Sequence, residues 1–157
     1  MSGMVSRTAQ HAIRAVLALA AEPDRPQGAA DLAHRVGAPP NYLSKLLKTL
    51  ADAGLLVSRK GSGGGFRLAK PLSEITLFDI VDPFDRLSKS DGCFLGGGLI
   101  CNSEAPCAIH RRWQPIRDNF LNMLKGSRLA EVGQQKTVRA AGSRPRTRKV
   151  QQAGKES

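Results

Sequence analysis

Residues 41–56 read N-Y-L-S-K-L-L-K-T-L-A-D-A-G-L-L, and this stretch decides the fold. Its leucines recur at helical spacing and form one apolar stripe, which consists of Leu43, Leu46, Leu47 and Leu50. The opposite face is polar and basic and carries Asn41, Ser44, Lys45 and Lys48. Pro40 suits the first helical turn, where its missing N–H has no partner to lose. The pattern predicts a helix that buries one face and presents the other to a polar partner.

Two helices are predicted before this stretch. Apolar residues recur at helical spacing over residues 6–21, and residues 28–36 show the same pattern over a shorter length. Gly37 ends the second helix and permits a sharp turn. A short helix, a glycine turn and a helix with a basic outer face predict a helix-turn-helix, whose second helix enters the major groove of DNA. The alternative is an ordinary helical hairpin with a solvated lysine face.

A β-hairpin is predicted directly after the helix-turn-helix. Residues 55–60 and 66–69 have the pattern of strands, and the glycine-rich segment 61–65 between them is typical of a hairpin tip. Three basic residues lie near this tip, namely Arg59, Lys60 and Arg67. They favour a wing that contacts the phosphate backbone or the minor groove. The glycine run does not indicate a nucleotide-binding loop, because no Gly-Lys-Ser/Thr triplet and no helix follow it.

Two further helices are predicted after the hairpin. Residues 73–81 form an apolar helical pattern with Ser73 or Thr76 as its N-cap, and we expect Pro83 to end or kink this helix. Residues 108–125 predict a long helix that carries the only tryptophan. Its apolar stripe is wider than a small winged domain covers alone. This indicates a twofold dimer that reads a pseudo-palindromic DNA site.

All three cysteines lie within fifteen residues, at Cys93, Cys101 and Cys107, and His110 follows them. Zinc and iron–sulfur clusters select soft thiolate ligands, and the glycines and proline of this loop let several thiols converge on one point. The three cysteines therefore predict a metal or redox site. An odd number of cysteines argues against a closed disulfide framework, although each can also pack as a small apolar side chain.

Other uses of these cysteines stay open. Together with the histidine they have the residue types of a tetrahedral zinc site. A second use is a cluster-free protein that is regulated by thiol oxidation. A third is a cysteine-dependent redox enzyme, which is disfavoured because the chain has no Cys-x-x-Cys pair and no base that can be placed beside a cysteine.

The formal net charge of +11 points to a polyanionic partner, nucleic acid before membrane. Residues 126–157 hold eight Lys or Arg against two acidic residues, so more than half of the excess charge lies there. We expect this tail to be disordered because it has few large apolar residues. Its basic run 144–149 is either solvated or adds nonspecific affinity for DNA. No signal peptide or membrane-spanning apolar run is evident, so we expect a cytoplasmic protein without membrane contacts.

The order of these elements resembles the winged-helix regulators of the family that includes IscR, NsrR and RirA. The matching segments are A-I-R-A-V-L-A-L-A at 12–20, the stretch 41–56, K-G-S-G-G-G-F-R-L at 60–68, I-T-L-F-D-I-V at 75–81 and the three cysteines. The resemblance implies a homodimeric transcription factor, not an enzyme, that binds a double-stranded DNA operator. It also implies control by an iron–sulfur cluster, 2Fe-2S or 4Fe-4S, that responds to iron, iron–sulfur supply, nitric oxide or redox state.

The resemblance also implies cluster ligands. Three cysteines hold the cluster in that family, and the corresponding residues here are Cys93, Cys101 and Cys107. His110 is similar to the histidine that completes the 2Fe-2S site of the IscR type. The seven-residue gap after Cys93, however, is closer to the 4Fe-4S type of RirA. Gln10 stands where NsrR members present an aspartate, so that ligand set is not matched, and His11 beside it is a lesser candidate.

The same resemblance implies the DNA contacts. Family members contact bases and phosphates with the start of the recognition helix and place a basic residue in the wing. Asparagine suits adenine, and lysine suits guanine or phosphate. The expected contact set consists of Asn41, Tyr42, Ser44, Lys45, Lys48, Arg59 and Lys60.

The expected fold is mainly α with a small β-hairpin. We expect a winged helix-turn-helix domain over residues 1–86 and a cysteine-rich cluster-binding loop over 87–107. A dimerisation helix over 108–125 and a basic, disordered tail over 126–157 complete the predicted chain.

Overall fold

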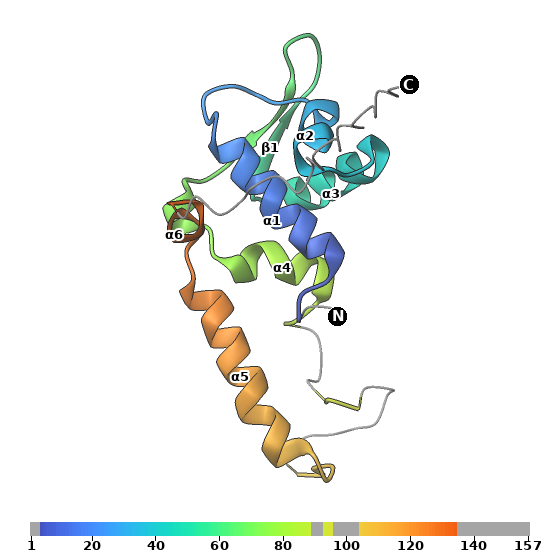
Figure 1. The fold of residues 1–157 in the computed structure, drawn as a ribbon, viewed down its shortest axis with the longest axis vertical. Helices are drawn as coiled ribbons and strands as arrows, with labels where there is room; N and C mark the ends of the chain where they lie inside the picture. The colour runs from blue at the N-terminus through green and yellow to red at the C-terminus, as the bar shows by residue number, and fades with distance from the viewer. Residues whose placement is uncertain (1–3, 89–92, 96–103, 135–157) are drawn as a thin grey trace, which may run out of the picture.

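The computed structural model describes residues 4–88, 93–95 and 104–134. The elements follow in the order α1 (Arg7–Ala20), α2 (Ala29–Val36), α3 (Pro40–Asp52), β1 (Leu56–Arg59), β2 (Gly65–Leu68), a 3-10 turn η1 (Leu72–Glu74), α4 (Leu77–Asp85), α5 (His110–Gly126) and α6 (Leu129–Gln134). The first three helices and the hairpin form one body, and α5 extends away from it as an arm (Figure 1). The mainly helical fold with one small hairpin is confirmed.

The helix-turn-helix forms from α2 and α3 as predicted. Gly37 follows α2 in the left-handed conformation, with φ of 73°, and its N–H donates to the carbonyl oxygen of Ala33 over 2.9 Å. Glycine adopts this conformation without the steric cost that a Cβ imposes. α3 then begins at Pro40, and its four stripe leucines are all buried. Pro40 therefore starts this helix, and the leucines of residues 41–56 supply its buried face.

Helix α1 packs in the middle of the fold and contacts α2, α3, α4 and β2. The side chains on its core-facing side are small and fully buried, and include Ala12, Ala15 and Val16. They pack in one cluster with leucines from α2 and α3, including Leu32, Leu43, Leu47 and Leu50. Burying one leucine side chain contributes about 1.5–3 kcal/mol, so this apolar cluster fixes how the three helices are arranged.

The hairpin is joined to the helical body through the segment before α2. β1 and β2 pair antiparallel, with Leu56 opposite Leu68 and Arg59 opposite Gly65. Gln27 pairs with Phe66 on the free edge of β2 through two backbone hydrogen bonds of 2.9 Å. Gly65 has φ of 144°, and a Cβ there would lie 2.5 Å from the Gln27 carbonyl oxygen. Glycine at this position is therefore what lets the wing lie against the helices.

The side chain of Gln27 strengthens the same junction. It is the buried polar residue of the core, and its Nε2 donates to the carbonyl oxygens of Ala18 and Leu19 at the end of α1, over 3.4 Å each. Its Oε1 accepts a 2.6 Å hydrogen bond from Arg35 of α2. Both ends of the buried amide are thus satisfied, and one residue ties together α1, α2 and the wing.

Helix α4 begins as predicted but ends later than its proline indicated. Thr76 caps it, with its hydroxyl accepting from the Asp79 N–H over 3.1 Å while the Asp79 carboxylate accepts from the Thr76 N–H over 2.9 Å. The helix continues past Pro83 and ends at Asp85. A proline so close to the helix end removes one hydrogen bond only, and the N–H of Arg86 still donates to Asp82 over 2.8 Å.

The prediction of a disordered tail from residue 126 onward was wrong for its first part. The N–H of Leu77 donates to the Ser127 carbonyl oxygen over 3.0 Å, and the N–H of Leu129 donates to Ile75 over 2.8 Å. Leu129 is fully buried and opens α6, which packs against η1. Pairing of backbone groups with a distant segment leaves no mark in the local sequence, which explains the error. Residues 135–157, including the basic run 144–149, lie outside the described residues.

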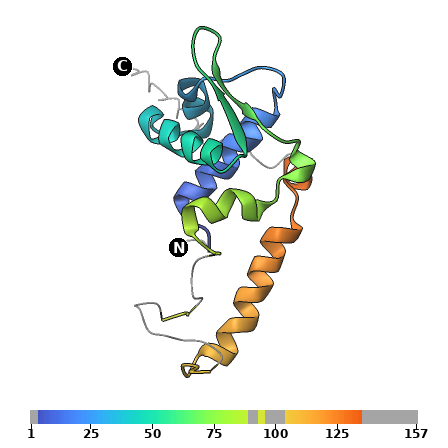
Figure 2. The same cartoon turned by 180° about the vertical axis from the view of Figure 1, so that it is seen from behind.

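The arm helix α5 is attached to the body at its C-terminal end. Leu124 is its buried residue and packs with Ala9 of α1 and Val81 of α4. Two apolar side chains of α5 are largely open to solvent: Ile116 is 53% exposed, and Met123, next to Leu124, is 49% exposed. The two views place the N-terminal end of α5 at the opposite end of the molecule from the wing (Figures 1 and 2). None of the helices in the described ranges has the length and apolar character that crossing a membrane requires.

Candidate functional site

The exposed face of α3 carries the polar residues predicted to contact DNA. Asn41, Ser44, Lys45 and Lys48 are all exposed, and the first turn of α3 has no acidic residue. Arg59 and Lys60, at the tip end of β1, are exposed as well. In the part of the chain that the structure describes, none of these four cations forms a salt bridge. Their charges are therefore directed to solvent, where a phosphate backbone can bind them.

Tyr42 differs from its neighbours on α3 because it is half-buried and packs against the core cluster. Its hydroxyl lies 3.3 Å from Nδ1 of His11 on α1, and the two rings meet edge to face with centroids 5.6 Å apart. The tautomer of the histidine decides which group donates the hydrogen bond. His11, a lesser candidate for a cluster ligand, thus contacts the recognition helix of its own chain. The adjacent Gln10 donates from Nε2 to the Val5 carbonyl oxygen over 3.1 Å.

The environment of His11 favours its neutral form. Partial burial lowers the pKa of His11 below its usual 6.5, because the charged ring is less well solvated there. The positive charges of Arg14 and then Arg7 on the same helix lower this pKa further. Near neutral pH the ring is therefore uncharged and can either donate to or accept from the Tyr42 hydroxyl.

Two of the three predicted cysteine ligands come together at the N-terminal end of α5. The sulfur atoms of Cys93 and Cys107 lie 4.0 Å apart, and both residues are partly buried. The N–H of His110, the first residue of α5, donates to the Cys107 carbonyl oxygen over 3.0 Å, and the Nε2 atom of its ring is buried. Cys101 lies outside the described residues. Within the described ranges, no group of three metal-ligating side chains is assembled.

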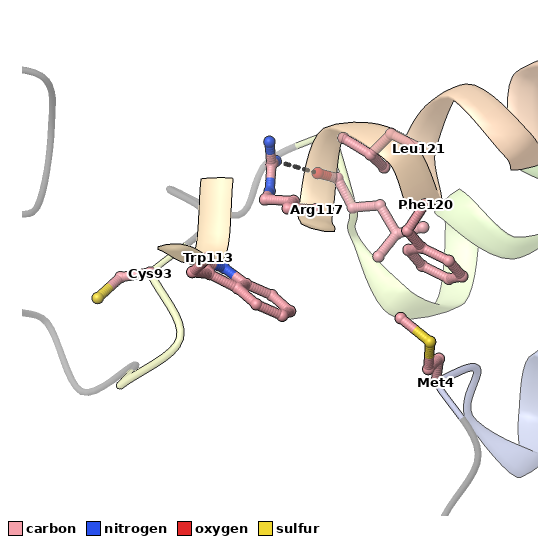
Figure 3. Close-up of a pocket in the computed structure, with 7 residues that line it drawn as sticks. Met4, Cys93, Trp113, Arg117, Phe120 and Leu121 are labelled. Carbon is pink, nitrogen blue, oxygen red and sulfur yellow. Dashed lines mark hydrogen bonds between the residues drawn. The ribbon is translucent and has the colours of Figure 1, made fainter. Parts of the chain in front are cut away.

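An apolar pocket of about 220 Å³ adjoins Cys93, one member of this pair (Figure 3). It is lined by Met4, Leu87, Cys93, Trp113, Arg117, Phe120 and Leu121. Phe94 packs edge to face on Trp113, with the ring centroids 5.2 Å apart, and this contact holds the residue next to Cys93 against α5. The Arg117 side chain donates to the Leu87 carbonyl oxygen over 3.2 Å and links α5 to the chain that leaves α4.

The two thiols at this end of α5 have a separation that suits two ligands of one metal ion. Two sulfur atoms that bind one tetrahedral ion at about 2.3 Å each are separated by about 3.8 Å. The observed 4.0 Å between Cys93 and Cys107 matches that separation. His110 follows Cys107 by three residues, but within the described residues its side chain does not form a ligand group with the two sulfur atoms. The sequence places Cys101 in the same loop.

The family model described as "Iron-dependent Transcriptional regulator", Rrf2, matches residues 5–135. The chain belongs to the Rrf2 family. It is therefore a DNA-binding transcriptional regulator and not an enzyme, which confirms the prediction from the sequence. This Rrf2 regulator is 30% identical to the HTH-type transcriptional regulator IscR of Escherichia coli O1:K1 over 146 residues, which cover 88% of this chain and 89% of the relative.

Solved structures of similar fold include two named regulators. IscR of T. potens matches with a TM-score of 0.64 and 24% identity, over 82% of this chain and 84% of that one. CymR, titled the global cysteine regulator of B. subtilis, matches with a TM-score of 0.67 and 22% identity, over 82% of this chain and 95% of that one. These structures confirm the winged-helix fold of the Rrf2 chain.

The sequence did not identify the residues that hold the helix-turn-helix and the wing in place. Gln27 and Arg35 were not singled out, because a polar residue in a turn carries no local sign that its side chain is buried. The contact between His11 and Tyr42 joins residues 31 positions apart and is likewise invisible in a local pattern. Gly65 was recognised only as part of a flexible tip, although its close approach to Gln27 gives it a specific structural role.

We predict that acidification weakens the fold through His11. Because the folded-state pKa is lowered, the contribution of the neutral ring is fully present above pH 6.5 and is lost as the pH falls from 6.5 through the lowered pKa. Substituting glutamine keeps a hydrogen-bonding group but removes the titration. We expect wild type to lose a few degrees more of its melting temperature between pH 7.5 and 5 than His11→Gln does.

The matched control is His34→Gln, since His34 is exposed on α2. This variant should follow the wild-type pH dependence in the same thermal melts. If His11→Gln shows the same loss on acidification as wild type, the titration of His11 does not contribute to stability.

Proposed function

We propose that this Rrf2 regulator is a homodimer whose binding to operator DNA is controlled by an iron–sulfur cluster. The proposed ligands are Cys93, Cys101 and Cys107, with His110 as the fourth. The observation that carries the proposal is the 4.0 Å separation of the Cys93 and Cys107 sulfur atoms at the start of α5. The description of the matching family as iron-dependent supports the choice of iron.

The proposed DNA interface is supported by the exposed face of α3 and by the wing. Asn41, Ser44 and Lys45 lie at the start of α3, where a recognition helix meets the base edges of the major groove. Lys48 continues the same face, and Arg59 and Lys60 extend the basic surface along the hairpin. Besides its predicted contact with DNA, Tyr42 has a structural role, because its contact with His11 fixes the start of α3 against α1.

The proposed dimer is supported by exposed apolar side chains on the arm helix α5. Ile116 and Met123 of α5 expose about half of their surface, and apolar area buried in an interface stabilises association by about 25 cal/mol per Å² before the costs of association. A second copy of the chain covers such a stripe most simply, in a twofold arrangement. Two recognition helices held at a fixed spacing then read the two halves of a pseudo-palindromic operator.

A continuous set of contacts connects the cysteine end to the DNA-facing surface. α5 packs on α1 through Leu124 and Ala9, and α1 contacts α3 through His11 and Tyr42. A cluster, when bound, supplies a centre whose charge and integrity depend on iron supply and redox state. Cys93, Cys107 and His110 would hold the loop against α5, and a change in that loop would reach α3 through α1.

A zinc ion is the second candidate at this site. The same sulfur separation fits two thiolates on one tetrahedral zinc ion, and three cysteines with one histidine are a common zinc ligand set. In that case the metal would stabilise the loop without responding to redox state.

Removing a DNA-facing lysine should weaken DNA binding without unfolding the protein. Lys45→Ala and Lys60→Ala each delete an exposed charge from α3 and the wing. Each variant should lower the slope of log affinity against log salt concentration by about one. The measurement is a titration of a duplex selected from genomic fragments by the wild-type chain, repeated at several salt concentrations.

The matched control for these variants is Lys70→Ala. Lys70 is an exposed lysine that follows β2 at the base of the wing, away from its tip. It should keep the wild-type salt slope. Unchanged affinity and slope for both Lys45→Ala and Lys60→Ala would contradict the proposed DNA interface.

Protein purified without oxygen should be coloured and should contain both iron and acid-labile sulfide. Cys93→Ala, Cys101→Ala and Cys107→Ala should each lose most of the bound iron, because each removes a proposed ligand. Ser103→Ala, a substitution in the same loop that removes no ligand, should keep it. Iron, zinc and sulfide are measured on the same preparations, together with visible absorbance.

Each result has a distinct meaning. Iron and sulfide that depend on the three cysteines support the cluster. A colourless protein with one zinc ion per chain and no sulfide supports the second candidate and contradicts the first. A protein without any metal contradicts both candidates. It does not affect the proposed DNA interface.

A further inference from the structure

The pair formed by Cys93 and Cys107 has a geometry that suits direct oxidation. The two residues are fourteen positions apart in the sequence, yet their sulfur atoms lie 4.0 Å apart. A disulfide bond is about 2.05 Å long, so the sulfur atoms need to approach by about 2 Å. Both residues are partly exposed.

Each cysteine is held near the start of α5 by a separate contact. Cys107 is fixed through its carbonyl oxygen, which accepts the 3.0 Å hydrogen bond from the His110 N–H. Cys93 is held by its neighbour Phe94, whose ring packs on Trp113 one turn further along the same helix. The closeness of the two sulfur atoms therefore follows from two anchors on one rigid element, which raises their effective concentration relative to thiols on a freely moving loop.

We propose that Cys93 and Cys107 form an intramolecular disulfide when the metal-free protein meets hydrogen peroxide. Cys93 is partly exposed, so a small oxidant from solvent can reach it. That sulfur attacks one peroxide oxygen, the O–O bond breaks, and a sulfenic acid and one water form. The Cys107 sulfur then attacks the Cys93 sulfur, the S–O bond breaks, and the hydroxyl group leaves as a second water with the Cys107 proton. Two thiols are oxidised by two electrons, and one peroxide is reduced to two waters.

The disulfide would give the regulator a second, oxidised state of the same loop. It would occupy two of the three proposed thiol ligands, so the chain could not bind a cluster until a reductant opened the bond. This consequence rests on the proposed cluster site, whereas formation of the bond itself does not. Cys101 would remain as the single thiol of the loop.

The test compares three full-length variants that each keep one pair of cysteines. Cys101→Ala keeps the Cys93–Cys107 pair, and Cys93→Ala and Cys107→Ala keep the two alternative pairs as matched controls. Each metal-free, reduced protein receives one equivalent of hydrogen peroxide, and the remaining thiols are counted by maleimide labelling and intact mass at successive times. We expect Cys101→Ala to lose both thiols at least about ten-fold faster than either control.

Peptide mapping of the wild-type chain checks the same pairing. Cleavage after Lys89, Glu104 and Arg111 gives the peptides 90–104 and 105–111, which separate Cys107 from the other two cysteines. In the oxidised protein these peptides should be joined, with the maleimide on Cys101. Equal oxidation rates in the three variants, or a wild-type disulfide that contains Cys101, would overturn the proposal. Anaerobic cluster loading of the same reduced wild-type preparation tests the proposed function separately, so either idea can fail without the other.

Discussion

The close packing of α1 in the centre of the molecule is the constraint on which the rest of the structure depends. Its core-facing residues Ala9, Ala12 and Ala15 are completely buried, and small side chains at these positions let neighbouring helices approach closely. α1 contacts the helix-turn-helix, the wing and α4, and Leu124 of the arm packs on it as well. Any shift of α1 therefore changes the surroundings of both α3 and the arm helix α5.

The central helix α1 connects the DNA-facing elements to the helix α5 that follows the cysteine loop. Among the described residues, the wing and the N-terminal end of α5 lie at opposite ends of the molecule (Figures 1 and 2). The arm is attached to the body through the Leu124 contact and through the backbone pairing of residues 127–129 with residues 75–77. α1 in turn reaches the start of α3 through the His11–Tyr42 contact. The path is therefore contiguous in space.

Much of the fold can be predicted from the sequence because it follows from local periodicity and turn chemistry. The leucine stripe of α3, the glycine at position 37 and the glycine-rich tip of the hairpin each determine a nearby element. The contacts that arrange these elements cannot be predicted in this way. These contacts are the hydrogen bonds of the buried Gln27 amide, the burial of Leu129 in the core and the contact of His11 with Tyr42. They all depend on segments that meet only in the folded chain. For the same reason, three nearby cysteines indicate a thiol site, but only the structure brings the sulfur atoms of Cys93 and Cys107 to 4.0 Å.

We propose that the state of the cysteine loop controls the DNA-binding surface. The most direct measurement is the dissociation constant for one selected DNA duplex, at fixed salt and without oxygen, for cluster-loaded protein and for the same protein after chelation of its metal. A coupling between the two sites predicts dissociation constants that differ by at least about ten-fold. Equal dissociation constants for the loaded and metal-free forms would contradict this account.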